Sequence, residues 1–116
     1  MTTGMIETIV GTGEPGYMGD GGPAKDARLN FPRDLEIGPD GHLYIADTDN
    51  SVIRAVDLST GMIRTVAGTG QLGFDGRENV DARAITLARP FGIEFDADGN
   101  LYICDTINSR IVKVTR

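Results

Sequence analysis

Two acidic stretches of the chain carry the side-chain oxygens that a cation site would need. Residues 47–50 read Asp-Thr-Asp-Asn, and residues 105–108 read Asp-Thr-Ile-Asn. A calcium loop of the EF type needs oxygen ligands at alternate positions, a central glycine and a distant glutamate, and neither stretch has this set. Asp and Asn side chains also bond to the backbone of their own turn, so we predict turns here rather than calcium sites.

Two glycine-rich stretches match the pattern of dinucleotide-binding loops. Residues 11–16 read Gly-Thr-Gly-Glu-Pro-Gly, and residues 68–73 read Gly-Thr-Gly-Gln-Leu-Gly. The pattern binds a pyrophosphate only where a strand leads directly into a helix. Pro15 and further glycines follow the first match, and neither match precedes a helical pattern. We therefore predict that both stretches are structural loops.

The remaining reactive side chains do not make up a catalytic set. His42 is the single histidine and lies in a predicted turn, without the partner that a general base or a zinc site requires. The single cysteine, Cys104, excludes an internal disulfide and lies in an apolar strand, as a small apolar residue would. The three serines lie in turns without a nucleophile-elbow motif. We expect no enzymatic activity.

An internal duplication sets the positions of all these residues. The stretch 40–53 recurs at 98–111, and the stretch 4–13 recurs at 61–70. In each copy an Asp-Gly turn, a short apolar run and an Asp-Thr-x-Asn-Ser turn lead into a second apolar run, which predicts a β-meander. A repeat of more than fifty residues built from short strands favours a β-propeller.

The elements that we expect are strands joined by turns and two long loops. The run at 43–46 is apolar on both faces, and no segment has enough helical periodicity to cover it, so other sheets must do so. One helical turn is expected at 23–29, within the first of two long loops, 11–30 and 68–84. The predicted strands are 5–10, 33–37, 43–46, 52–56, 62–67, 91–95, 101–104 and 110–114.

These strands do not divide evenly into blades. The whole chain, 1–116, holds a first blade at about 31–67 and a second blade at about 91–114, which has three strands; residues 5–10 are of the fourth-strand type. Two blades cannot close a ring, and unpaired strand edges are a liability. We predict a velcro strand exchange, in which residues 5–10 of one chain complete the second blade of the next, head to tail. Two, three or four chains would give four, six or eight blades.

The duplicated residues resemble a known family. Phe31-Pro32-Arg33, the stretch from Pro39 to Arg54, and the Val-Ala-Gly-Thr-Gly run at 66–70 are similar to NHL repeats of the long-loop bacterial type. Known NHL domains are mostly six-bladed propellers, so the resemblance implies a homotrimer of this chain. The family includes protein-binding scaffolds, RNA-binding platforms, sensor domains and relatives with lyase activity, so it does not fix a function. A chain of two repeats resembles a fragment, a designed chain or an ancestral-type unit.

The first strand of each propeller blade lines the central channel, and acidic residues occur on both first strands. Asp34 stands where the second copy has Gly92, and Glu36 and Glu94 occupy equivalent positions, with Arg33 beside them. In a symmetric ring these carboxylates would converge and could hold a cation, with Asp34 and Glu36 as weak metal candidates. The alternative is that they pair with Arg33, Arg89 or Arg54 and keep the channel hydrated.

Net charge limits the partners. The formal charge of −6 and the pI near 4.6 disfavour nucleic acid and anionic membranes, both of which need clustered Lys and Arg. The first residues carry no signal-peptide pattern and no apolar run could span a bilayer, so the chain as given is expected to be soluble, with its compartment left open. We predict a non-enzymatic, self-assembling propeller for protein interaction, without a cofactor. The alternative is a propeller that binds a cation or small ligand in its channel, with lyase- or lactonase-like activity in a parent protein.

Overall fold

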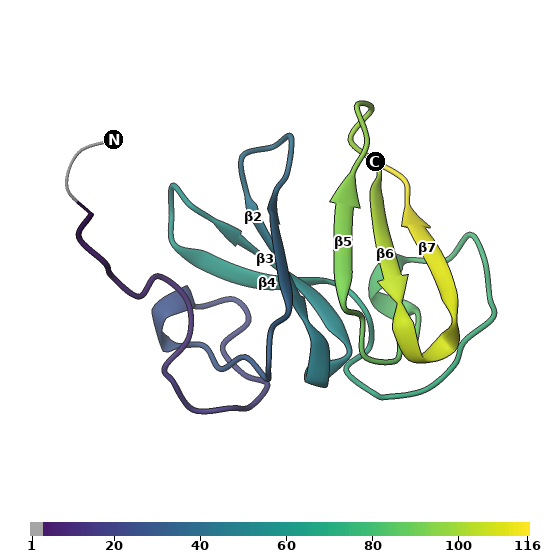
Figure 1. The fold of residues 1–116 in the computed structure, drawn as a ribbon, viewed down its shortest axis with the longest axis horizontal. Coiled ribbons are helices and arrows are strands. Elements are labelled where there is room, and N and C mark those ends of the chain that lie inside the picture. The colour runs from purple at the N-terminus through teal and green to yellow at the C-terminus, as the bar shows by residue number, and fades with distance from the viewer. Residues whose placement is uncertain (1–3) are drawn as a thin grey trace.

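The computed structural model describes residues 4–116, which form two antiparallel sheets standing next to each other (Figure 1). The first sheet has four strands in the order β1-β2-β3-β4, and the second has three in the order β5-β6-β7. Their bounds are β1 Asp34–Ile37, β2 Leu43–Asp47, β3 Val52–Asp57, β4 Met62–Ala67, β5 Gly92–Phe95, β6 Leu101–Asp105 and β7 Arg110–Val114. The expected meanders are confirmed, each with bounds within a few residues of the predicted ones.

The two sheets repeat each other in register as well as in sequence. Asp34 pairs with Ala46 in the first sheet, and Gly92 pairs with Cys104 in the second, at the positions that the duplication equates. The second and third strands of each sheet are joined by one turn of 3-10 helix, at Thr48–Asn50 (η2) and Thr106–Asn108 (η4). The serine after each turn has a left-handed backbone, which lets the chain reverse into the next strand. The predicted turns are therefore confirmed.

An aspartate holds the turn between the first two strands in each sheet, from a different position in each. The hydroxyl of Tyr44 donates to Asp40 at 2.7 Å, and that of Tyr102 donates to Asp96 at 2.9 Å. Asp96 also accepts bonds from the backbone and side chain of Asn100. These bonds, those of Asn100 first, hold the pKa of the Asp96 carboxyl at about 2, below its ordinary value of 3.8.

This lowered pKa predicts a loss of stability in acid. Because the folded-state pKa of Asp96 lies below the unfolded value, its contribution is complete above about pH 4 and is lost as the pH falls toward 2. Replacing Asp96 with asparagine should lower the melting temperature at neutral pH. The melting temperature of the variant should also fall less steeply than that of wild type between about pH 4 and pH 2. Melting curves by circular dichroism at a series of pH values test this, and a variant whose curve runs parallel to wild type would refute it.

The main hydrophobic core lies between the two sheets. Ala46, Ile53 and Ala67 of the first sheet are buried with Ile93 and Ile103 of the second. Tyr44 and Phe95 add an edge-to-face ring contact across the same interface, with centroids 4.7 Å apart. As the two-sided apolar strands predict, one sheet covers the other and no long helix takes part in this core.

The two long loops pack under the sheets. The first contains η1 (Ala24–Asp26), the single helical turn that was expected, and buries Ala24 and Ala27 against Leu43, Ile45 and Ile63. The second ends in η3 (Ala82–Ala84), where the Asp81 side chain accepts a bond from the backbone N of Arg83. Both glycine-rich stretches run into these loops rather than into a helix that could meet a pyrophosphate.

Residues 5–10 were predicted to be a strand that pairs with a second copy of the chain. In the single chain they form no strand, with Met5 94% and Ile6 101% exposed. The reason is that a strand needs a partner edge, whereas this segment lies at the opposite end of the molecule from β7 (Figure 1). Within residues 4–116, no helix is long and apolar enough to cross a membrane.

Candidate functional site

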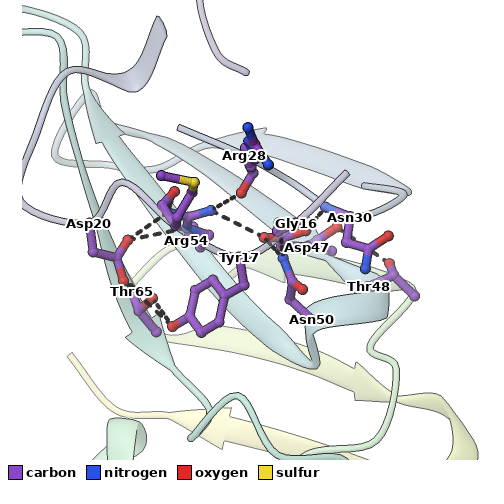
Figure 2. A network of polar contacts seen from close by, with 12 residues as sticks. Gly16, Tyr17, Asp20, Arg28, Asn30, Asp47, Thr48, Asn50, Arg54 and Thr65 are labelled. Atoms are coloured by element: carbon purple, nitrogen blue, oxygen red, sulfur yellow. Dashed lines mark hydrogen bonds and ion pairs between the residues drawn. The ribbon is translucent and has the colours of Figure 1, made fainter. Parts of the chain in front are cut away.

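A buried arginine joins the first long loop to the first sheet. Arg54 of β3 is fully buried and donates to Asp20 at 2.8 Å and to Asp47 at 3.4 Å, between which its guanidinium lies in Figure 2. It also donates to the backbone carbonyls of Arg28, at 2.7 Å, and Met18, at 3.0 Å. A single side chain therefore satisfies two carbonyls and one carboxylate of the loop.

Asp47, at the end of β2, is the second centre of this network. Its carboxylate accepts bonds from the backbone N of Asn30 at 2.7 Å and from the Asn50 side chain at 2.9 Å, and Asn50 in turn bonds the carbonyl of Gly16. Burial raises the pKa of Asp47, and the donors Asn30, Asn50 and Arg54 oppose that rise. The prediction that these side chains cap the backbone of their own turn is wrong, because they bind the preceding loop and one another.

The second sheet contains the same network. The Asp105 carboxylate accepts from the backbone N of Ala88 at 2.7 Å and from Arg110 Nε at 2.7 Å. Arg110 donates to the carbonyls of Asp75 and Thr86, which are the repeat equivalents of the two carbonyls in the first network. The two networks are therefore the same structural clamp on the two long loops, and we assign them no ligand.

The two arginines come from different positions in their strands. Arg54 is the third residue of β3, and Arg110 is the first residue of β7. Residues two apart point to the same face of a strand, so either position can reach the aspartate at the end of the neighbouring strand. This role was not predicted from the sequence, although a charged residue within the apolar run 52–56 was the available signal.

Polar contacts also link the two sheets near their ends. Thr48 donates its hydroxyl to the carbonyl of Pro90 at 2.7 Å, and Ser51 Oγ accepts from the backbone N of Arg89. The Arg89 guanidinium pairs with Asp49 at 2.8 Å. The turn η2 of the first sheet therefore holds the segment that leads into β5, which fixes how the second sheet stands against the first.

Asp34 and Arg33, two of the predicted channel residues, take part in this junction. The Asp34 carboxylate accepts from the backbone N of Ile93 at 2.9 Å, which links β1 to β5. Arg33 lies 3.5 Å from Asp49, and its guanidinium stacks over the Phe91 ring at 4.6 Å. Arg33 and Asp34 do not pair with each other, and the hydrogen bond of Asp34 links the two sheets.

The other predicted channel residues, Glu36 and Glu94, lie on β1 and β5, half-buried and exposed respectively. In the part of the chain that the structure describes, their carboxylates make no hydrogen bond or ion pair. In the single chain, Arg33, Arg89 and Arg54 bind other carboxylates, so the alternative pairing of the channel acids with these arginines is not formed there. Over the same residues, no group of three His, Cys, Asp or Glu could hold a metal ion, so the channel cation stays a prediction for an assembled ring.

The other candidate residues are placed as follows. His42 lies in the turn before β2 and is half-buried, with its ring nitrogens 3.6 Å from Asp40 and 3.7 Å from Asp57. Cys104 is half-buried on β6, where the equivalent Ala46 is fully buried. The difference arises because Ala46 faces the second sheet, whereas Cys104 lies on a face that no other sheet of the described chain covers.

Each sheet has one face that no other sheet of the described chain covers, although the first long loop packs on part of this face in the first sheet. The leading face, on the first sheet, contains Leu35 and Ile37, which are 60% and 55% exposed. The trailing face, on the second sheet, contains Tyr102, Cys104 and Ile111, the last of which is 65% exposed. The leading face also borders a hollow of about 500 Å³ that residues 8–10 help to line.

A four-stranded and a three-stranded meander that stack through apolar faces define a pair of β-propeller-like blades. The family model for the teneurin NHL domain matches residues 3–77. The chain therefore belongs to the NHL-repeat family, as its residues indicated.

Relatives agree with this assignment, and a solved structure agrees with the fold. The chain is 33% identical over 91 residues to the chloroplastic protein SUPPRESSOR OF QUENCHING 1 of Arabidopsis thaliana, with 78% of this chain and 8% of that protein covered. It is 30% identical to Teneurin-1 of Mus musculus (86% and 4% covered) and to NHL repeat-containing protein 2 of Bos taurus (83% and 13% covered). A putative phosphatase from Bacteroides thetaiotaomicron matches with a TM-score of 0.72 at 24% identity, covering 91% of this chain and 25% of that one, which supports the fold alone. The chain thus spans a small part of each of these proteins.

Proposed function

We propose that this chain is a non-enzymatic interaction module that self-assembles, with the trailing face of one copy docked on the leading face of the next. The observation that carries the proposal is that the exposed residues of the two faces are the equivalents of residues buried between the two sheets. Leu35, 60% exposed, corresponds to Ile93, which is 5% exposed. Ile111, 65% exposed, corresponds to Ile53, which is fully buried. The leading and trailing faces therefore match each other as the two sheet faces in the main core do.

A change of chemistry at the rim supports the same pairing. At the internal junction Asp49 forms an ion pair with Arg89. Their repeat equivalents are Ile107 and Phe31, which are 58% and 62% exposed in the single chain. Docking of the two faces would place these two side chains against each other, so an apolar contact would take the place of the ion pair. Both positions of the pair are thus charged at the internal junction and apolar on the outer faces.

The contact is heterologous, because the two faces differ, and repetition of it closes a ring if the rotation per chain allows. We propose three chains, because a six-bladed ring is the usual NHL architecture. The molecule would then present its long loops at the rim as a surface for protein partners. Among residues 4–116, no contact favours the alternative of a cation in the channel, since Asp34 already bonds to the backbone of β5.

Mass in solution tests the proposal. Light scattering on the purified chain should give about 37 kDa, three times the chain's 12.4 kDa, and the value should hold on moderate dilution. A mass of two or four chains would keep self-assembly and correct the blade number. A mass of one chain would overturn self-assembly.

A further inference from the structure

A groove of about 850 Å³ runs along the outer edge of the second sheet, between β7 and the loop at 76–82. We propose that this groove binds residues 5–10 of a second copy as the fourth strand of the sheet, in one fixed register. The proposal rests on the self-assembly proposed above and on the strand exchange predicted from the sequence, and it adds the groove, the register and the residue pairs. It concerns the edge of a sheet, whereas the docking of faces concerns the surfaces between sheets.

The first sheet shows what such a groove holds. There β4 lies between β3 and the first long loop, and the loop bonds to the outer edge of β4. Gly21 N donates to the carbonyl of Ile63 at 2.7 Å, Ile63 N to the carbonyl of Gly22 at 3.0 Å, and Ala24 N to the carbonyl of Gly61 at 2.7 Å. In the second sheet, β7 takes the place of β3 and the loop at 76–82 takes the place of this loop. The groove is therefore the equivalent of the space that β4 occupies.

Residues 5–10 have the sequence that this groove requires. They read Met-Ile-Glu-Thr-Ile-Val, against Met-Ile-Arg-Thr-Val-Ala in β4. Ile6 is fully exposed in the single chain, whereas its equivalent Ile63 is 1% exposed. The outer edge of β7 offers unpaired backbone groups, and adding an extended segment to such an edge is a common way for chains to bind.

Residues 5–10 lead into the first long loop in the same way that β4 leads into the second. Gly11 N donates to the carbonyl of Ala24 at 2.9 Å, and Gly68 N donates to that of Ala82 at 2.9 Å, at equivalent positions. The start of each long loop is thus anchored in the same way relative to its own sheet. When the leading face docks on a trailing face, residues 5–10 are carried to the β7 edge of the neighbouring copy. They cannot reach the β7 of their own chain, which lies at the far end of the molecule (Figure 1).

The register follows from the pairing of β3 with β4, which is shifted by one residue after Ile53. Applied to the second sheet, this register places Glu7 of the second copy opposite Lys113. The equivalent pair in the first sheet is Arg64 opposite Ala55. Oppositely charged residues directly across two strands attract each other. The complete set of expected pairs is Ile111 with Val10, Val112 with Thr8, Lys113 with Glu7, Val114 with Ile6, and Thr115 with Met5, with Ile9 as the extra residue.

Disulfide trapping tests this register. In a Cys104→Ala background, Glu7→Cys and Lys113→Cys place two thiols on facing residues, whose Cα atoms are about 4.5–5.5 Å apart in an antiparallel pair and so within disulfide range. Mild oxidation should link chains to one another, giving reducible bands of higher mass on denaturing gels. The matched control is Glu7→Cys with Arg116→Cys, three residues out of register, for which we expect at least about tenfold less cross-linking.

The outcomes separate this inference from the proposed function. An oligomeric wild type whose facing cysteines cross-link no better than the control would overturn the strand exchange and leave the docking of faces standing. A cross-link within one chain, seen as a faster-running monomer, would also overturn the exchange. As a second test without cysteines, Glu7→Lys should lower the oligomeric fraction, and adding Lys113→Glu should restore it. Failure of the double variant to restore assembly would refute the pairing of these two residues.

Discussion

Replacing Arg54 with alanine is expected to destabilise the fold by about 3–5 kcal/mol, the usual cost of removing one partner from a buried ion pair. The guanidinium is fully buried and bonds to Asp20, Asp47 and two loop carbonyls. Without it the buried Asp47 carboxylate loses its counter-charge. Because a small domain has a total stability of about 5–15 kcal/mol, the loss would be a large fraction of the total. Urea unfolding followed by circular dichroism, at one fixed protein concentration, measures the loss.

Two further variants make this test specific. Arg83→Ala removes an arginine from an ion pair that is largely exposed, so its unfolding midpoint should stay at that of wild type. Combining Arg54→Met with Asp47→Asn removes both charges, and should recover part of the stability lost in Arg54→Ala. An Arg54→Ala protein that unfolds at the midpoint of Arg83→Ala would show that the network does not hold the loop.

Replacing Ile111 with aspartate is expected to abolish self-assembly while leaving the single chain folded. Ile111 is 65% exposed in the single chain, so the substitution costs little there. In the docked faces the carboxylate would be buried without a partner, which costs several kcal/mol at every junction of the ring. Light scattering should give the mass of one chain, and the far-ultraviolet circular dichroism should match that of wild type.

The heterologous contact allows a sharper version of this experiment. Leu35→Asp damages the leading face and should also give single chains. A mixture of the Ile111→Asp and Leu35→Asp proteins retains one intact pair of faces, and should form a dimer that neither forms alone. Leu58→Asp, at an exposed position in the turn between β3 and β4, is the control that should still assemble. Assembly of Ile111→Asp at the wild-type mass would contradict the assigned faces.

The duplicated clamp explains how the loops can vary while the sheets stay the same. Asp47 and Asp105 occupy equivalent positions, and each receives an arginine, although Arg54 and Arg110 come from different positions in their strands. The bonds go to backbone carbonyls of the loop, which every residue type has. The clamp therefore constrains the course of each loop and leaves most of its side chains free to differ.

The sequence by itself determined the strands, their turns and the duplication. These features depend on neighbouring residues, since alternating apolar side chains and Asp-Gly or Asp-Thr-x-Asn turns act over a few positions along the chain. The bounds of β4 and β7 were predicted to the residue for this reason. Residues 5–10 have the same local pattern but form no strand in the single chain, because the unpaired edge of β7 lies at the far end of the molecule (Figure 1).

Only the tertiary structure decided which polar groups meet. Asp20 and Arg54 are 34 residues apart, and their contact depends on the path of a glycine-rich loop that no local pattern specifies. In the same way Asp34, predicted to face a channel, bonds to the backbone of the neighbouring sheet, because the approach of β1 to β5 brings Ile93 within reach. Patterns along the chain fix secondary structure, whereas the pairing of charges depends on how distant segments pack, and so it required the folded coordinates.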